Sequence, residues 1–534
     1  MDGQITDGKG SQTPSGYSYN RSTGTVNITD DGCQRFERFE VTGSLRAIEL
    51  FAGVGGFRLG LEESGWKVVW SNQYEPSSKT RQHASEIYRL RFKDKKTNHV
   101  NRDINDVLEE MEMSGNGVSL FPKHDLLVGG FPCQDYSVAR VLNQAAGLLG
   151  QKGVLWWSIF RLLKLLKSED KQPRFLLLEN VDRLIKSPAN QRGRDFAVML
   201  ASLQVLGYRV EWRVVNAAEY GFPQRRRRVF IVGQLSEDPS DDHKARPSAK
   251  ETIFTEGILA QALPVDPLIG TCPFDLVSGF PLSDRPLEEG GSQTNEEITL
   301  YLQQISESFG AGVKKTRFRN AGVMIDGIVH TVDVKPVDIE ENEKRVLRDV
   351  VEEARTYRIN KGLPMVVGEQ FYLDASNEDE EGKWEKLKNA KSEFRIHRAS
   401  GFEYHYTEGK MDFPDSLDKA SRTILTGEGG SAPSRFKHVI WDGDRKRRLT
   451  PEELELLNGF PPGHTKSPEG CPPITDGKRA FLMGNAVVVG IVAKIGSELA
   501  KRAKATKNRN DRAAAIKKSP SLGTSEELVA TSAD

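Results

Sequence analysis

The sequence predicts an α/β fold with a mostly parallel sheet and helices on both of its faces. Between residues 45 and 233, short apolar runs alternate with amphipathic stretches, which is typical of repeated strand–helix–strand units. The runs are mostly apolar and show no strict polar alternation, so we expect buried strands. One amphipathic stretch, Val154–Lys167, carries leucine and isoleucine at helical spacing. The predicted strands are Arg46–Phe51, Lys67–Trp70, Asp125–Val128, Phe175–Leu178 and Val229–Val232.

The composition fits a folded protein of several domains. The chain has 534 residues, of which 37% are hydrophobic and 28% are charged, enough apolar material for a sizeable core. Its 75 basic and 75 acidic residues cancel, whereas nucleic-acid-binding domains are usually basic. Binding to nucleic acid would therefore depend on local basic clusters, which occur at Arg225–Arg228, Arg445–Arg448 and Lys501–Lys518.

No feature of the sequence predicts export, a membrane span or a metal site. The four cysteines are widely scattered, which argues against a disulfide framework and fits a reducing cytoplasm. There is no apolar run of 18 residues and no basic-then-apolar leader at the N-terminus. The histidines lack metal-ligand spacing, so we expect no metal.

Changes in composition and apolar patterning divide the chain into five parts. Residues 1–44 read as a flexible arm and residues 45–233 as the α/β region. Residues 234–419 are turn-rich, with a charged helix near Ile339–Ile359 and an acidic stretch, Glu378–Glu385, that we interpret as a solvated loop. Residues 420–505 include predicted helices at Pro451–Leu457 and Ala486–Lys504, and residues 506–534 form a polar tail.

A glycine-rich turn follows the first predicted strand and precedes a helix. Glycines at this position let a ligand approach the backbone at a helix N-terminus. A dinucleotide fingerprint requires a sixth-position glycine, where this chain has Arg58, so the spacing argues against a nicotinamide oxidoreductase. An acidic residue, Glu75, follows at about the distance of a ribose partner. Taken alone, the turn fits a structural role as well as a cofactor site.

A thiol, a carboxylate and two arginines follow strand ends that share one edge of the predicted sheet. A lone cysteine is more often an apolar core residue than a nucleophile. Cys133, however, lies beyond the carboxyl end of a strand, where open α/β sheets bind their ligands. Glu179 ends the next strand, and alternation in the last strand directs Arg226 and Arg228 to one side. This set favours covalent catalysis on an electron-poor ring.

These segments, in this order, resemble the motifs of the cytosine-C5 DNA methyltransferase family. The resemblance covers about residues 45–233 and 420–500, and the uncovered middle third is where that family keeps its variable target-recognition domain. The main matching segments are Phe51-Ala52-Gly53-Val54-Gly55-Gly56, Gly130-Phe131-Pro132-Cys133-Gln134, Glu179-Asn180-Val181, Gln224–Arg228 and Gly484-Asn485-Ala486-Val487. Further similar segments are Arg102-Asp103-Ile104, Lys152-Gly153-Val154-Leu155, Arg448–Pro451 and Gly459–Pro461.

The resemblance implies a Rossmann-like, S-adenosylmethionine-dependent catalytic domain over residues 45–233 and a target-recognition domain with variable insertions over 234–419. Residues 420–505 would contain the C-terminal part of the recognition domain and a return helix that completes the catalytic domain. A cytosine would be flipped out of double-stranded DNA and attacked at C6 by Cys133 before C5 is methylated. The implied catalytic residues are Cys133, Glu179, Arg226, Arg228, Pro132 and Asn180. The implied cofactor residues are Phe51, Ala52, Gly53, Gly55, Gly56, Phe57, Gln73, Glu75, Asp103, Ile104, Leu155, Asn485 and Val487. The expected DNA contacts are Gln134, Ser137, Arg225, Arg435, Lys437 and Arg448.

Two positions depart from the family pattern. The family usually has Asn-Glu-Trp-Asp or a similar sequence after the second strand, where this chain has Asn72-Gln73-Tyr74-Glu75, so either Glu75 or Gln73 would bind the ribose. Lys152 stands where arginine is common, which keeps the charge but loses the forked geometry.

We expect a monomeric enzyme of the bacterial cytoplasm, either the modification partner of a restriction system, whose endonuclease would act separately, or a solitary or phage-borne enzyme. The alternatives are a tRNA cytosine-C5 methyltransferase of the same fold, whose Cys-Phe-Thr signature is not found here, and a non-catalytic DNA-binding regulator. Intact Pro132, Cys133 and Glu179 argue against the regulator.

Overall fold

The computed structural model describes most of the chain. It covers residues 17–20, 25–28, 45–78, 80–93, 98–113, 121–131, 155–188, 190–235, 246–268, 278–285, 293–310, 315–373, 378–396, 403–468 and 470–518. Most of the predicted N-terminal arm, the end of the predicted tail and the segment that contains Lys152 lie outside these residues.

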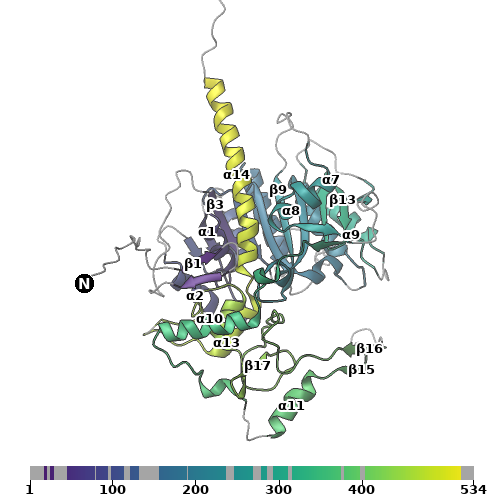
Figure 1. Ribbon diagram of the computed structural model, residues 1–534. Helices are drawn as coiled ribbons and strands as arrows, with labels where there is room; N and C mark the ends of the chain where they lie inside the picture. The colour runs from purple at the N-terminus through teal and green to yellow at the C-terminus, as the bar shows by residue number, and fades with distance from the viewer. Residues whose placement is uncertain are drawn as a thin grey trace, which may run out of the picture.

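One large sheet of ten strands organises the larger part of the molecule, the sheet domain (Figure 1). Its strands are β3 (Leu45–Leu50), β4 (Trp66–Asn72), β5 (Asn98–Val100), β6 (Leu126–Gly130), β7 (Phe175–Val181), β8 (Tyr208–Asn216), β9 (Arg227–Leu235), β11 (Ser278–Pro281), β12 (Ala321–Ile325) and β13 (Ile328–Val332). Their order is β11-β13-β12-β8-β9-β7-β6-β3-β4-β5. The pairings from β5 to β7 are parallel and those from β7 to β11 are antiparallel. The α/β fold class is confirmed, but the sheet is mixed and not mostly parallel.

Helices cover both faces of this sheet, as the mostly apolar strands predicted. The helices are α1 (Gly56–Glu63), α2 (His83–Arg91), α3 (Ile104–Met113), α5 (Leu155–Ser168), α6 (Arg194–Val205), α7 (Ala249–Glu251), α8 (Ile258–Ala262), α9 (Asn295–Ser308) and α14 (Val489–Lys518). On β3, Ile48 and Leu50 join a core shared with α3, α5, α6 and α9, whereas Leu45 and Ala47 join one shared with α1, α8 and α14. This double burial explains why the strands lack polar alternation.

The C-terminal helix α14 returns to the start of the sheet and packs along α1 (Figure 1). A Cβ atom at Gly60 of α1 would lie 2.7 Å from the Val489 carbonyl oxygen, so glycine is what allows the two helices to approach this closely. Ser64 and Trp66 add hydrogen bonds to backbone carbonyls of α14. The segment Asp476–Thr506 is long and apolar enough to span a bilayer, but 72% of its most apolar window is buried inside the protein, as in a core helix.

A small lobe lies beneath the sheet domain in Figure 1. It comprises α10 (Leu347–Asn360), α11 (Glu378–Lys388), β15 (Lys391–Ile396), β16 (Glu403–Glu408), β17 (Val439–Asp442), β18 (Arg445–Arg448), α12 (Pro451–Leu457) and α13 (Asp476–Asn485). Its inner core includes Leu347, Ile424, Leu454 and Phe460, and extends to Ile87 on α2 of the sheet domain. The two parts therefore share one apolar contact region.

The remaining elements are short. They are β1 (Tyr17–Asn20), β2 (Thr25–Ile28), β10 (Val265–Pro267), β14 (Val334–Pro336), η2 (Asp182–Lys186), η3 (Ala217–Tyr220), η4 (Thr252–Glu256), η5 (Glu341–Glu343) and η6 (Glu369–Phe371). Strand β1 pairs with β2 inside the predicted N-terminal arm, and β10 pairs with β14.

Several predicted boundaries need correction. The helix at Pro451–Leu457 is confirmed, but the acidic stretch predicted as a loop forms α11, in which Trp384 is fully buried. Strands β11–β13 join the main sheet, so part of the segment assigned to a recognition domain belongs to the sheet domain. Helix α14 continues to Lys518, beyond its predicted end and into the segment predicted as a tail. The formation of α11 and the position of β11–β13 depend on burial or pairing far along the chain, which local patterns do not specify.

Candidate active site

Glu179 lies at the carboxyl end of β7, beside the end of β6. Gly130 of β6 is its partner in the parallel register. A Cβ atom at Gly130 would lie 3.3 Å from the Glu179 Oε2 atom, so a larger residue there would crowd the carboxylate. The side chain of Glu179 is 12% exposed, so it is largely but not fully buried. This edge of the sheet is where open α/β folds bind ligands.

Arg228 of β9 pairs with this carboxylate, and Arg226, one residue before β9, interacts with it electrostatically. The Nε atom of Arg228 lies 3.0 Å from the Glu179 Oε1 atom. The guanidinium of Arg226 is buried and donates to the carbonyl oxygens of Ile424 (3.1 Å) and Gly484 (2.9 Å). Burial, with repulsion from Arg228, lowers the pKa of Arg226 to about 9. Arg226 thus joins β9 to two segments more than 190 residues further along the chain.

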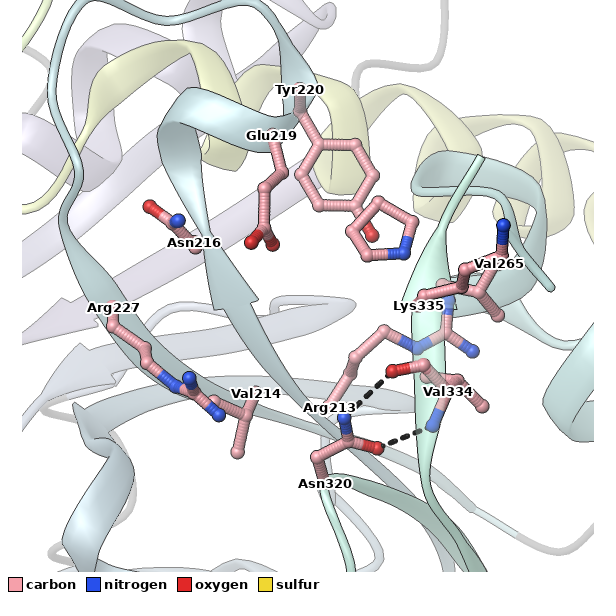
Figure 2. Close-up of a pocket in the computed structure, with 11 residues that line it drawn as sticks. Arg213, Val214, Asn216, Glu219, Tyr220, Arg227, Val265, Asn320, Val334 and Lys335 are labelled. Atoms are coloured by element: carbon pink, nitrogen blue, oxygen red, sulfur yellow. Dashed lines mark hydrogen bonds between the residues drawn. The ribbon is translucent and has the colours of Figure 1, made fainter. Parts of the chain in front are cut away.

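Arg227, between these two residues, faces another part of the molecule (Figure 2). Its side chain is 60% exposed, lies 3.4 Å from Asp182 and lines a polar cavity of about 180 Å³. Arg213, Tyr220 and Lys335 also line this cavity. The alternation along β9 therefore separates the arginines of the candidate active site from this neighbouring cavity.

The Asn180 side chain stabilises the backbone at the end of β6 by hydrogen bonding. Its Nδ2 atom donates to the carbonyl oxygen of Phe131 (3.0 Å), and its Oδ1 atom accepts from the backbone of Val181 (2.8 Å). Phe131 itself is buried against Trp156. The predicted residues Pro132, Cys133, Gln134 and Ser137 follow directly and lie outside the described residues. The structure consequently fixes the point from which the cysteine segment departs, two residues before Cys133.

The glycine turn between β3 and α1 is held by its neighbours. Phe51 and Gly53 have positive φ angles of 54° and 55°, which glycine adopts without strain at the second position. The backbone of Ala52 donates to the Asn72 carbonyl oxygen (2.9 Å). The backbone of Gly53 donates to the side-chain oxygen of Gln73 (2.7 Å). A Cβ atom at Gly53 would meet nothing within 4 Å, so the turn borders open space.

The other predicted cofactor residues surround this turn but have different local roles. Asp103 caps α3 by accepting from the backbone of Asn105 (2.9 Å), while Ile104 is buried and Leu155 is half-buried at the start of α5. Phe57 is buried in α1 beneath the turn. Val487 packs against the Gly56 position, where an added Cβ atom would lie 2.8 Å from it. Asn485 is exposed at the end of α13.

Gln73 and Glu75 are already engaged within the protein. Gln73 uses its side-chain oxygen to hold the glycine turn, as described above, and is only 8% exposed. Glu75 lies 3.4 Å from the Nζ atom of Lys478 on α13. Gln73 is thus placed to shape the turn, and Glu75 keeps one carboxylate oxygen beyond this ion pair.

Glu49 was missed by the sequence analysis. It is fully buried in β3, two residues before Phe51, and its Oε2 atom accepts from the Tyr88 hydroxyl (2.8 Å). Its Oε1 atom has no hydrogen-bond partner among the described residues. Burial raises the pKa of Glu49 to about 8. The sequence signal that could have identified Glu49 is a carboxylate inside a mostly apolar predicted strand.

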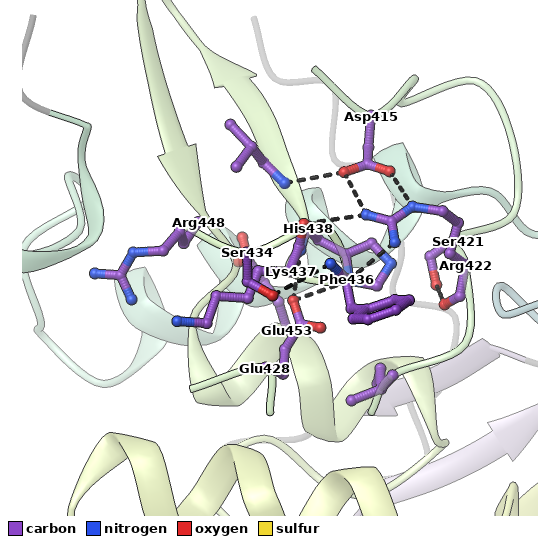
Figure 3. Close-up of polar contacts among 12 residues, drawn as sticks. Asp415, Ser421, Arg422, Glu428, Ser434, Phe436, Lys437, His438, Arg448 and Glu453 are labelled. Carbon is purple, nitrogen blue, oxygen red and sulfur yellow. Dashed lines mark hydrogen bonds and ion pairs between the residues drawn. The ribbon is translucent and has the colours of Figure 1, made fainter. Parts of the chain in front are cut away.

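Three of the residues predicted to contact DNA form hydrogen bonds within the protein. Lys437 donates to the carbonyl oxygens of Gly430 (2.9 Å) and Ala432 (2.7 Å), and Arg448 donates to Gly430 (2.8 Å) and Gln370. Arg435 donates to three carbonyl groups and pairs with Glu408. All three side chains are buried, and Figure 3 shows Lys437 and Arg448 within the small lobe. Their charges stabilise the lobe, whereas Arg225 remains exposed.

Comparison with known proteins identifies the chain's relatives. The family model for C-5 cytosine-specific DNA methylase matches residues 45–266 and 300–501. Type II methyltransferase M.Sau3AI of Staphylococcus aureus is 40% identical over 461 residues, which cover 86% of this chain and 96% of that protein. M.NgoBI of Neisseria gonorrhoeae and M.HaeII of Haemophilus aegyptius are 35% and 36% identical over 35% and 36% of this chain and half of their own lengths. Among solved structures, Spodoptera frugiperda DNMT2 aligns with 85% of this chain and 99% of its own at a TM-score of 0.46 and 13% identity.

The family match covers most of the sheet domain, the small lobe and the returning helix, and the strand ends carry the carboxylate and arginines in the arrangement described above. The chain belongs to the C-5 cytosine-specific DNA methylase family and is a DNA (cytosine-5-)-methyltransferase.

Proposed function

We propose that this methyltransferase uses Cys133 as a covalent nucleophile, with S-adenosylmethionine as methyl donor, and modifies one specific sequence in duplex DNA. The observation that carries the proposal is the Glu179–Arg228 pair at the end of β7, beside the strand whose next segment contains Cys133. A carboxylate that pairs with one arginine and is still partly exposed can hydrogen-bond a cytosine ring.

The steps on the base follow from these residues. The Cys133 thiolate forms a bond to C6, while Glu179 hydrogen-bonds N3 and the exocyclic amine and stabilises the electrons displaced into the ring. C5 thereby becomes nucleophilic and takes the methyl group. Loss of the C5 proton then restores the double bond and expels the thiolate, so the enzyme is regenerated. Arg228 orients Glu179, and Arg226 holds the surrounding segments together.

The glycine turn fits S-adenosylmethionine, which supplies an electrophilic methyl group when bound. The turn borders open space at Gly53, and the buried Oε1 atom of Glu49 lacks a partner among the described residues. Backbone amides at a helix start are suited to the carboxylate group of an amino acid moiety. Phe51, Asp103 and Val487 lie around the turn and would hold the remainder.

The biological setting is also proposed from the relatives. The curated relatives are type II methyltransferases of bacteria, which supports a modification enzyme of a restriction–modification system in the bacterial cytoplasm. A separately acting endonuclease would then cut the same sequence when it is unmethylated. We propose that the enzyme acts as a monomer.

One experiment tests the chemistry. The full chain is incubated with radiolabelled S-adenosylmethionine and either duplex DNA or tRNA, and methylated cytosines are mapped by bisulfite sequencing. We expect label in DNA at one short sequence, and a loss of roughly 10³-fold or more in Cys133→Ser and about 10²-fold in Glu179→Gln. Cys471→Ser, which changes an exposed thiol, is the matched control and should retain full activity.

A second readout isolates the covalent step. DNA that contains 5-fluorocytosine cannot lose the C5 substituent as a proton, so the wild-type enzyme should remain attached to it during denaturing electrophoresis. Cys133→Ser should give no such adduct. Label confined to tRNA, or an adduct formed equally by the variant, would refute the proposed function.

A further inference from the structure

The β15–β16 ribbon carries two large apolar side chains that the protein does not cover. The strands pair in register from Lys391↔Glu408 to Ile396↔Glu403. Phe394 is 78% exposed and Ile396 is 63% exposed. Figure 1 shows the ribbon standing away from the body of the small lobe. A two-stranded ribbon is marginally stable alone, and exposed apolar groups of this size commonly mark a binding site.

The ribbon has one internally packed face and one open face. On the packed face, the Arg395 guanidinium lies 3.6 Å from the centre of the Tyr406 ring. The open face presents Ser392, Phe394 and Ile396, together with their cross-strand partners Thr407, His405 and Glu403. Period-two alternation places these six side chains on the same side, and all are exposed. The open face thus combines apolar groups with hydrogen-bonding groups.

The base of the ribbon is fixed firmly to the lobe. Arg435 donates to the carbonyl oxygens of Leu387 (2.8 Å) and Asn389 (2.6 Å) before β15, and to Gly409 after β16. Its Nε atom also lies 2.8 Å from the Glu408 carboxylate. One buried arginine therefore holds both ends of the ribbon, so the open face is presented from a rigid support.

The charges around the ribbon favour DNA as the occupant of the open face. Two of its acids are neutralised internally, Glu393 by Arg395 (3.0 Å) and Glu408 by Arg435. Lys386 and Lys410 are exposed and Lys391 is half-buried at the base, where they can meet phosphates on the edges of a groove. Glu403, near the tip, can accept a hydrogen bond from a cytosine amine.

The dimensions and chemistry of the major groove complete the match. This groove, about 12 Å wide, admits a two-stranded ribbon, and the thymine 5-methyl is the apolar group on its base edges. We propose that the open face of β15–β16 enters the major groove and that Phe394, with Ile396 beside it, contacts the methyl group of a thymine in the recognition sequence. This inference rests on the proposed function, because it assigns part of the sequence specificity of that reaction.

The test compares thymine with uracil, which lacks only the methyl group. One long DNA is amplified with either dTTP or dUTP, and methyl transfer is measured at low DNA concentration. For the wild-type enzyme we expect about a tenfold higher rate on thymine DNA, the effect of one methyl group in an apolar contact. Phe394→Ala should be slower on thymine DNA and should show a thymine-to-uracil ratio near one. Phe394→Leu should keep part of the ratio.

Ile359→Ala is the matched control, because Ile359 is a 53% exposed apolar residue of α10 outside the ribbon. It should keep the wild-type ratio. Equal rates of the wild-type enzyme on both DNAs, or an unchanged ratio in Phe394→Ala, would overturn the inference and leave the proposed function intact. If neither the thymine DNA nor the uracil DNA were labelled, both the inference and the proposed function would be overturned. A change in oligomeric state in Phe394→Ala with an unchanged ratio would assign the face to a second copy of the chain.

Discussion

The sheet domain and the outer part of the small lobe, residues 378–448, are stabilised in different ways. In the sheet domain, two large apolar clusters fill both faces of the strands. In the outer lobe, Trp384, Val439 and the partly buried Phe413 form a small apolar cluster with Leu373, while Ile424 and Ile440 join the inner core. There, buried polar side chains carry the contacts, and Figure 3 shows several of them converging around His438.

The difference lies in the directionality of the interactions. Apolar burial depends mainly on the area removed from water, so it can be anticipated from residue type and spacing. A buried ion pair stabilises only when its geometry is complete, and removing one partner leaves an uncompensated charge. The outer lobe should therefore be more sensitive to single polar substitutions than its small size suggests.

The largest effect that would test this contrast is expected for Asp415→Ala. Asp415 accepts from Arg422 through both oxygens (2.7 and 3.1 Å) and from the backbone of Val439 (2.9 Å). Its loss should cost about 3–5 kcal/mol, because it leaves a buried arginine without its carboxylate. The unfolding should be confined to the lobe, seen as loss of hydrogen-exchange protection there before the sheet domain opens.

Asp418→Ala provides the control for that substitution. Asp418 pairs with Arg348 at 2.8 Å, but both side chains are largely exposed, so the change should stay within about 0.5 kcal/mol. If the two aspartates gave similar losses, or if Asp415→Ala unfolded the whole chain in one step, the distinction between the regions would not hold.

A smaller effect should come from Glu49, a polar exception inside the sheet domain. Burial raises its pKa from 4.5 to about 8, so between these pH values the native state holds a proton that the unfolded chain has lost. Wild-type stability from this group should consequently fall as pH rises from about 5 to 8, by at most about 1.4 kcal/mol per pH unit. Glu49→Gln should flatten the profile in urea titrations at a series of pH values.

Glu110→Gln removes an exposed carboxylate that pairs with Arg102 and should leave the wild-type slope unchanged. If the unfolding free energies of the wild type and Glu49→Gln depended on pH in the same way, Glu49 would not titrate in this range. Glu49 would then not count as a polar exception inside the sheet domain.

The smallest effect is expected for Lys388→Met in the outer lobe. Burial lowers the pKa of Lys388 to about 8, and its Nζ atom donates to the Lys437 carbonyl oxygen (2.5 Å). Arg422 donates to the same oxygen (3.1 Å), so that oxygen remains paired without the lysine. Replacing a buried cation by an apolar residue of similar size should change the unfolding free energy by less than about 1 kcal/mol near pH 7.5. Lys386→Met, at an exposed position, is the control. A loss of about 3 kcal/mol in unfolding free energy for Lys388→Met alone would show that this lysine stabilises the lobe through its hydrogen bond.

The same division explains which sequence predictions succeeded. The apolar runs located β3, β6, β7 and β9 to within a few residues, because a strand buried on both faces has a local composition signal. The acidic stretch was predicted as a loop because it has too few apolar residues to give a helical pattern. In the structure one buried apolar residue, Trp384, anchors α11. The position of β11–β13 in the main sheet was not predicted, because it depends on the pairing of β12 with β8, more than 100 residues earlier, and on the pairing of β13 and β11 beside β12.

The sequence by itself determined the α/β class and the order of the segments that carry Cys133, Glu179 and the arginines, because both are written in local composition and spacing. Only the tertiary structure decided what individual polar residues do. Gln73 holds the glycine turn and Arg435 clamps a ribbon, because their partners lie about 20 and 26–48 residues away in the chain. A hydrogen bond or ion pair requires both partners in one geometry, and the fold alone brings them together.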